Sequence, residues 1–174
     1  MVFDITANPG VLILLAGLLG LIVGSFLNVV ILRVPARMMH DWRLQSRHIL
    51  ELDNTEAEPA PPGIVREPSH CPQCKHKLSP LENIPLLSWL VLRGRCRHCQ
   101  ASISIQYPLI ELLTGIASAL VIWELGLTEQ AGAGLVLTWL LIAAAGIDAR
   151  TQLLPDSMTL LLLWIGLLLS VFPL

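Results

Sequence analysis

Two pairs of cysteines have the residue type and spacing best suited to chemistry. Cys71 and Cys74 form one CxxC pair, Cys96 and Cys99 form another, and 21 residues separate the pairs. Because each pair can turn two thiolates toward one centre, this spacing predicts a four-cysteine zinc site. A closed site of this kind has no open coordination position, which indicates a structural role. Redox-active pairs or disulfides are the alternatives.

Basic side chains flank these cysteines, whereas two histidines, His76 and His98, adjoin them without being required as ligands. Four thiolates on one zinc dication leave a net negative charge, which nearby cations offset. The same cations could instead rest on anionic lipid headgroups. The basic residues are Lys75, Lys77, Arg93, Arg95 and Arg97.

Four acidic residues are candidates for a second site. An ionisable side chain at the end of an apolar membrane segment is costly and is a functional candidate by default. Asp148 is the strongest, because it follows an apolar run at an expected helix C-terminus, where the macrodipole disfavours negative charge. Asp156 and Glu111 also fit ordinary helix N-terminal positions, and Glu82 fits a solvated surface position.

The elements that must position these groups are long apolar runs. Of 174 residues, 54% are hydrophobic and 14% are charged, and the mean hydropathy is +0.68. Residues 11–32 are long enough to cross a bilayer at ~1.5 Å per residue. Three further runs follow, so we expect an all-α polytopic membrane protein with about four transmembrane helices. These runs cover about 108–125, 131–147 and 160–174.

The first run is expected to be retained as a helix of the bundle. A cleavable signal peptide needs a basic segment before its apolar run, and the only charge before residue 32 is Asp4. Gly17, Gly20 and Gly24 form a small-residue stripe that allows another helix to approach closely. Asn28 lies one turn beyond the stripe and needs a polar partner inside the bundle.

The distribution of basic residues predicts the orientation. All but one of the 11 Lys and Arg residues lie between Arg33 and Arg97. The positive-inside rule therefore places this region in the cytoplasm and the N-terminus outside. With a net charge of -2 and no basic tail, the chain is not expected to bind nucleic acid.

These patterns divide the chain into three parts. We expect a first transmembrane segment at 1–32, a cytoplasmic loop at 33–107 and three transmembrane helices at 108–174. A zinc-ribbon-like four-cysteine module occupies about 68–105 of the loop. Before it, residues 38–50 can form a short amphipathic helix, and the acidic, Pro-rich residues 51–63 form a linker.

Several motifs are similar to those of the type IV prepilin peptidases, a family of leader peptidases and N-methyltransferases. The resemblance implies a multi-pass aspartic endopeptidase of the bacterial inner membrane. Such an enzyme removes the basic leader of type IV prepilins or type II secretion pseudopilins, and then methylates the new N-terminus with S-adenosylmethionine. The motifs are GSFLNVVILRVP, PSHCPQC, NIPLLSWLVLRGRCRHC, ISIQYPLIELLTG and IDARTQLLPD.

The resemblance also assigns residues. It implies that Asp148 is the first catalytic aspartate, that Pro155 and Asp156 match the family's following Pro-Asp pair, and that the four cysteines are those of its cytoplasmic domain. Two departures are Gln106, where the family often has Arg, and Arg150, where it often has an acidic residue or His. A third is that the second catalytic aspartate, in a GxGD-type motif, has no counterpart before Leu174.

Aspartic peptide hydrolysis needs two carboxyl groups that share a proton across one water. Asp156 is a poor second member, since eight helical residues at ~1.5 Å each would place it about 12 Å from Asp148. We therefore expect the missing spans to come from a longer form of the chain or from a partner. The acids Glu82, Glu111 and Asp156 are candidates to attract the basic leader.

Two other functions remain open from the sequence. A zinc-bearing membrane protein without the second aspartate could hold pilins or secretion components as a binding or assembly module. A thiol-redox membrane protein would instead need accessible, reversible CxxC disulfides. No Gly-rich cofactor loop is recognisable, so methylation is implied only by the resemblance.

Overall fold

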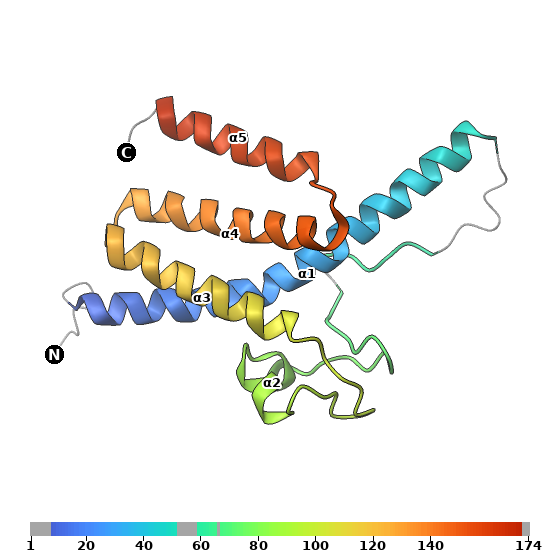
Figure 1. Ribbon diagram of the computed structural model, residues 1–174, viewed down its shortest axis with the longest axis horizontal. Helices are drawn as coiled ribbons and strands as arrows, with labels where there is room; N and C mark the ends of the chain where they lie inside the picture. The colour runs from blue at the N-terminus through green and yellow to red at the C-terminus, as the bar shows by residue number, and fades with distance from the viewer. Residues whose placement is uncertain (1–7, 52–58, 66, 172–174) are drawn as a thin grey trace.

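A computed structural model describes residues 8–51, 59–65 and 67–171 (Figure 1). Within these ranges the chain is helical, with isolated β-bridges and no strand, which confirms the expected all-α architecture. Four longer helices form a bundle, and the cysteine module lies between the first two of them in the sequence. The elements are α1 (Pro9–Ile49), η3 (Pro80–Asn83), α2 (Leu87–Val91), α3 (Gln106–Leu125), α4 (Glu129–Thr151) and α5 (Asp156–Val171).

Helix α1 is longer than the sequence suggested. It begins where the Asn8 side chain accepts a hydrogen bond from the Gly10 N–H and Pro9 occupies the first turn. It does not end near residue 32 but continues to Ile49, so the expected amphipathic helix is the second half of α1. Pro35 lies inside it and removes one backbone hydrogen bond, which favours bending. This half extends away from the bundle (Figure 1).

The segment after α1 was expected to be a linker, and residues 52–58 of it lie outside the described residues. The part that follows is held against α1 by two arginines. Arg33 donates to the carbonyl of Glu67 at 2.9 Å, and Arg37 donates to the carbonyl of Pro61 at 3.2 Å. These contacts bring the chain back along the outer half of α1 before it enters the cysteine module.

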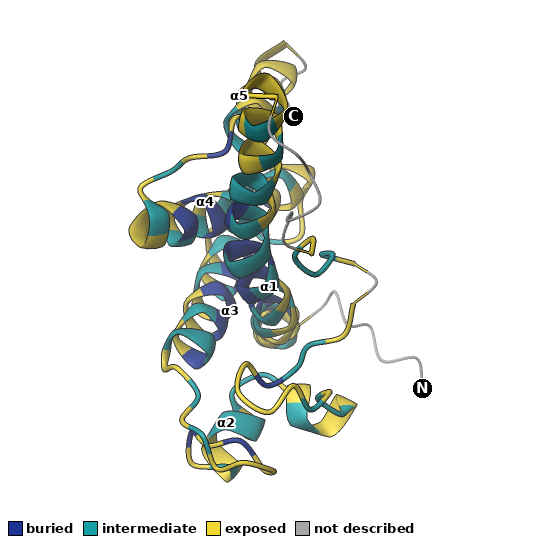
Figure 2. Cartoon of the chain, turned by 90° about the vertical axis from the view of Figure 1, so that its right-hand side faces the viewer, coloured by how far each residue is buried: buried dark blue, intermediate teal, exposed yellow. Residues whose placement is uncertain are grey.

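Helices α1 and α3 meet along the predicted glycine stripe. A Cβ added to Gly20 would lie 2.6 Å from the Thr114 carbonyl oxygen and 2.8 Å from the Gly115 Cα. A Cβ added to Gly24 would lie 2.7 Å from the Glu111 Cα. Because real side chains do not tolerate such distances, these positions require glycine. Figure 2 shows the buried residues on the facing sides of α1, α3 and α4.

Two polar contacts join the helices within this apolar bundle. Asn28 is 1% exposed, and its amide nitrogen donates to the carbonyl of Tyr107 at 3.0 Å, which links α1 to the start of α3. Trp139 on α4 donates through Nε1 to the Ser118 hydroxyl on α3 at 2.9 Å. Asn28 therefore has the partner expected from the sequence, and both contacts fix helix register where water is scarce.

The described helices α1, α3 and α4 are long and apolar enough to cross a membrane. The fourth expected span corresponds to α5, whose 16 described residues are fewer than a full crossing needs. Figure 1 shows α5 running beside α4, yet none of the α5 side chains in the described range is buried. Apart from the side that packs on the bundle through Met158, its apolar surface is therefore open to lipid or to another helix.

Candidate metal centre and aspartate site

The two cysteine pairs sit in turns of the same local fold. In the first, the Cys71 N–H donates to the His76 carbonyl at 2.9 Å, and the Lys75 N–H donates to the Cys71 carbonyl at 3.0 Å. The second turn repeats both hydrogen bonds from Cys96 onward, at 2.8 and 3.0 Å. Lys75 and Gln100 each adopt the left-handed conformation, with φ of 58°. Each turn therefore directs both of its thiols to one side.

The four sulfur atoms converge, each within 4.8 Å of the others. Cys71 Sγ lies 3.7 Å from Cys99 Sγ, and Cys74 Sγ lies 4.0 Å from Cys96 Sγ, so the short distances run between the two turns. A tetrahedral metal with bonds of ~2.3 Å holds sulfurs ~3.8 Å apart, whereas a disulfide needs ~2.05 Å. The geometry fits a shared metal ion, and the cysteines are not disulfide-bonded.

The thiols influence one another's protonation. A hydrogen bond from the Cys74 backbone lowers the pKa of Cys71 to about 6. Cys74 also receives a backbone hydrogen bond, from His76, but loss of water and the neighbouring thiols raise its pKa to about 11. Deprotonating both without a cation is therefore unfavourable, and a dication would remove this conflict by stabilising all the thiolates.

Glu111 ties the cysteine module to the bundle. This residue of α3 is 7% exposed, and its Oε2 accepts a hydrogen bond of 2.8 Å from the Leu86 N–H. Leu86 precedes α2 and has a φ of 58° and a ψ of -48°, and its N–H points to the Glu111 carboxylate on α3. Glu111 was a leader-binding candidate from the sequence, and no local pattern predicts this contact, because it joins residues 25 positions apart.

Glu82 closes a small capping box at the start of η3. The Ser79 N–H donates to its Oε2 at 2.9 Å, and its own N–H donates to the Ser79 hydroxyl. The backbone and side chain of Ser79 hold the pKa of Glu82 below its usual value, so the carboxylate is ionised at neutral pH. Its carboxylate lies within 4.8 Å of ring nitrogens of His76 and His98.

Asp148 and Asp156 lie at one end of the bundle, on either side of a tight turn. Asp148 is exposed in the last turn of α4, and Asp156 is the exposed first residue of α5. Between them, Gln152 adopts a left-handed conformation and ends α4, while Pro155 is buried. Helices α3, α4 and α5 alternate in direction, so the start of α3 lies at this same end (Figure 1).

A hydrogen bond at this end joins the two residues that depart from the resembled family. The Arg150 guanidinium donates to the side-chain oxygen of Gln106, which links the last turn of α4 to the first residue of α3. Arg150 is two residues from Asp148. The two departures are unrelated in the sequence, because no local signal pairs residues 44 positions apart.

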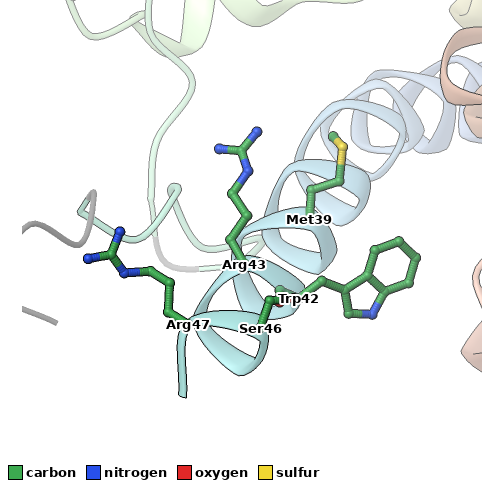
Figure 3. A pocket seen from close by; sticks show the side chains of 5 residues that line it. All are labelled: Met39, Trp42, Arg43, Ser46 and Arg47. Carbon is green, nitrogen blue, oxygen red and sulfur yellow. The ribbon is translucent and has the colours of Figure 1, made fainter. Parts of the chain in front are cut away.

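A surface hollow lies elsewhere, on the outer half of α1. Met39, Trp42, Arg43, Ser46 and Arg47 line it, and their side chains diverge around the single helix (Figure 3). None of the predicted site residues lines this hollow. It therefore has no part in the candidate metal centre or aspartate site.

Two family models match successive parts of the chain. The bacterial peptidase A24 N-terminal domain matches residues 18–125, which contain most of α1, the cysteine module and α3. The chain belongs to the bacterial A24 peptidase family. A second model, the type IV leader peptidase family, matches residues 135–173 of this A24 chain and so includes Asp148 and Asp156. The resemblance drawn from the motifs is thereby confirmed.

Curated relatives of this A24 chain carry the name prepilin leader peptidase/N-methyltransferase. One from Stutzerimonas stutzeri is 51% identical over 97% of this chain and 58% of its own length. One from Xanthomonas campestris is 53% identical, over 92% of this chain and 55% of its own. One from Pseudomonas aeruginosa is 47% identical over 97% of this chain and 58% of its own length. The chain thus spans a little over half the length of these relatives. No solved structure matches it.

Proposed function

We propose that this A24 chain forms the N-terminal part of an intramembrane aspartic endopeptidase that removes the basic leader from type IV prepilins or type II secretion pseudopilins. The observation that carries the proposal is the position of Asp148. It is an exposed carboxylate at the end of a membrane-length helix, within the region that matches the type IV leader peptidase family.

Peptide hydrolysis then requires a second carboxyl group opposite Asp148. In such a pair one carboxylate takes a proton from the attacking water, and the other carboxyl group donates to the carbonyl oxygen of the scissile bond. We assign the second group to a segment beyond the described residues or to a partner. Asp156 opens the next helix and stays a candidate for contact with the basic leader, as does Glu82, whereas the carboxylate of Glu111 is buried and holds the Leu86 N–H.

The four cysteines would hold one zinc ion. Cys71 and Cys96 are buried whereas Cys74 and Cys99 are exposed, so the centre lies near the module surface. With four protein ligands the ion would be structural, fixing the two turns against each other. We place the module on the cytoplasmic face of the inner membrane, because the basic residues gather there and a reducing compartment keeps the thiols free.

N-methylation with S-adenosylmethionine is the second proposed activity, supported by the relatives' name. The described residues present no Gly-rich loop of the kind that binds such a cofactor. We therefore assign no residue of this chain to that cofactor and derive no step through it.

The test is a cleavage assay with the protein at its native length in detergent or nanodiscs. The substrate is a synthetic peptide with a short basic leader followed by an apolar helix, and mass spectrometry follows the products. We expect one cut between the leader and the apolar segment, and a methyl group on the new N-terminus when S-adenosylmethionine is added. An intact peptide, with the protein bound to it, would instead support a binding or assembly role.

A further inference from the structure

A cluster of two imidazoles and one carboxylate lies on the cysteine module outside its four-cysteine centre. Ligand atoms of His76, Glu82 and His98 all lie within 4.8 Å of one another, and the two histidine rings have centroids 3.5 Å apart. Two imidazoles with a carboxylate are a ligand set suited to zinc and its neighbours in the transition series. We propose that these three residues bind a second divalent transition-metal ion, separate from the ion at the cysteines.

Three different segments supply the ligands, and each is already fixed. His76 belongs to the first cysteine turn, where its carbonyl accepts from the Cys71 N–H at 2.9 Å. His98 lies between the two cysteines of the second turn. Glu82 is held by the Ser79 N–H at 2.9 Å. Because the backbones are in place, binding orders only side chains, which keeps its entropic cost low.

The second site would differ chemically from the cysteine centre. Metal bonds of ~2.0–2.1 Å to nitrogen and oxygen place tetrahedral ligand atoms ~3.4 Å apart, which is within the 4.8 Å that the three ligand atoms span. The two imidazole planes are tilted by 36° with centroids 3.5 Å apart, so binding requires the rings to rotate until one nitrogen of each points at the ion. Three protein ligands leave one position open to water, and His98 is exposed. The ion at this site would therefore exchange more readily than one enclosed by four thiolates.

The second site depends on the proposed four-cysteine centre in one respect, which is that the two cysteine turns hold His76 and His98 in position. Cobalt separates the two sites, since thiolate ligands give intense charge-transfer absorption and nitrogen or oxygen ligands do not. The full chain, purified without a histidine tag and stripped of metal, is titrated with Co²⁺. We expect one equivalent with charge-transfer absorption, followed by a weaker second equivalent without it, and two ions per chain by elemental analysis.

The variant His98→Gln should bind one Co²⁺ with the charge-transfer absorption unchanged, which also shows that the module has folded. Glu82→Gln should lower the affinity for the second Co²⁺ ion. The matched control, His48→Gln at the end of α1, should still bind two Co²⁺ ions per chain. Saturation of the wild-type chain at one equivalent of Co²⁺ would overturn the proposal. A changed charge-transfer band in His98→Gln would also overturn it, because His98 would then be a ligand of the cysteine centre. Binding of an ion that lacks this band but depends on His98 would support the second site and refute the cysteine centre.

Discussion

At the scale of single residues, the contact between Arg150 and Gln106 is the feature of the aspartate site that the sequence did not reveal. The cysteines could be predicted because their spacing is local and each CxxC turn is encoded by a few consecutive residues. The Arg150 contact depends on how α3 and α4 pack, which no short stretch of sequence contains. The same holds for the Glu111 contact with Leu86.

We predict that Arg150→Ala and Gln106→Ala each slow leader cleavage severalfold, because the contact fixes the last turn of α4 that carries Asp148. A double-mutant cycle on unfolding should give a coupling of about 0.5–1.5 kcal/mol, the range for one hydrogen bond. The control pair combines Arg150→Ala with Gln45→Ala, an exposed residue on the outer half of α1. Additive effects in the first pair, as in the control, would show that the contact does not couple the helices.

Glu111 provides a second prediction at this scale. Its replacement by Ala would leave the partly buried Leu86 N–H without its acceptor, at a cost of about 1 kcal/mol, the lower end of the range for an unsatisfied group. We expect faster trypsin cleavage at the arginines of the module, followed by mass spectrometry, while the metal content stays unchanged. Glu111→Gln keeps an acceptor oxygen, so its rate of trypsin cleavage should lie between those of the wild type and Glu111→Ala. Cleavage at the wild-type rate in Glu111→Ala would rule out the tie between module and bundle.

At the scale of elements, the sequence predicted the helices and the glycine stripe because hydropathy and small-residue spacing are local patterns. It did not predict that α1 continues to Ile49. The apolar run ends at residue 32 and the charged residues begin at Arg33, which placed the boundary there, but the helix continues through Pro35, since a proline can bend a helix without ending it. Here Arg33 and Arg37 bind the returning chain alongside α1.

The glycine stripe of α1 can be tested by substitution with a larger side chain. Gly20→Leu should separate α1 from α3 and destabilise the bundle by about 1–3 kcal/mol or more, because the new side chain meets the Thr114 and Gly115 backbone. Gly132→Leu is the matched control, since a Cβ there meets nothing within 4 Å. The measurement is the thermal unfolding midpoint in detergent. Equal midpoints for the two variants would contradict the close approach of α1 and α3.

At the scale of the whole molecule, the bundle and the cysteine module are stabilised in different ways. Burial and helix contacts hold the bundle, whereas the module has two buried cysteines and no described helix longer than α2. The module should therefore depend on its metal, as small metal-bound domains do. Sequence patterns separated these two units but did not show how Glu111 joins them.

Metal removal should act on one unit alone. We expect a strong chelator, or Cys96→Ser, to expose the module to trypsin while the helical circular dichroism of the bundle is retained. Cys96 is chosen because it is buried within the centre. Unchanged trypsin sensitivity after complete metal loss would mean that the module folds without metal.

One substitution tests directly whether Asp148 is one of the two catalytic carboxyl groups. Asp148→Asn keeps the side-chain size but removes the acid–base group, so leader removal by the native-length protein should fall by at least about 100-fold. Thermal unfolding should be unchanged, and Glu124→Gln, an exposed acid at the far end of α3, should cleave at the wild-type rate. Mass spectrometry of the leader peptide gives the result. Loss of cleavage in Asp148→Asn alone is the predicted outcome, and cleavage at the wild-type rate in that variant would contradict the account.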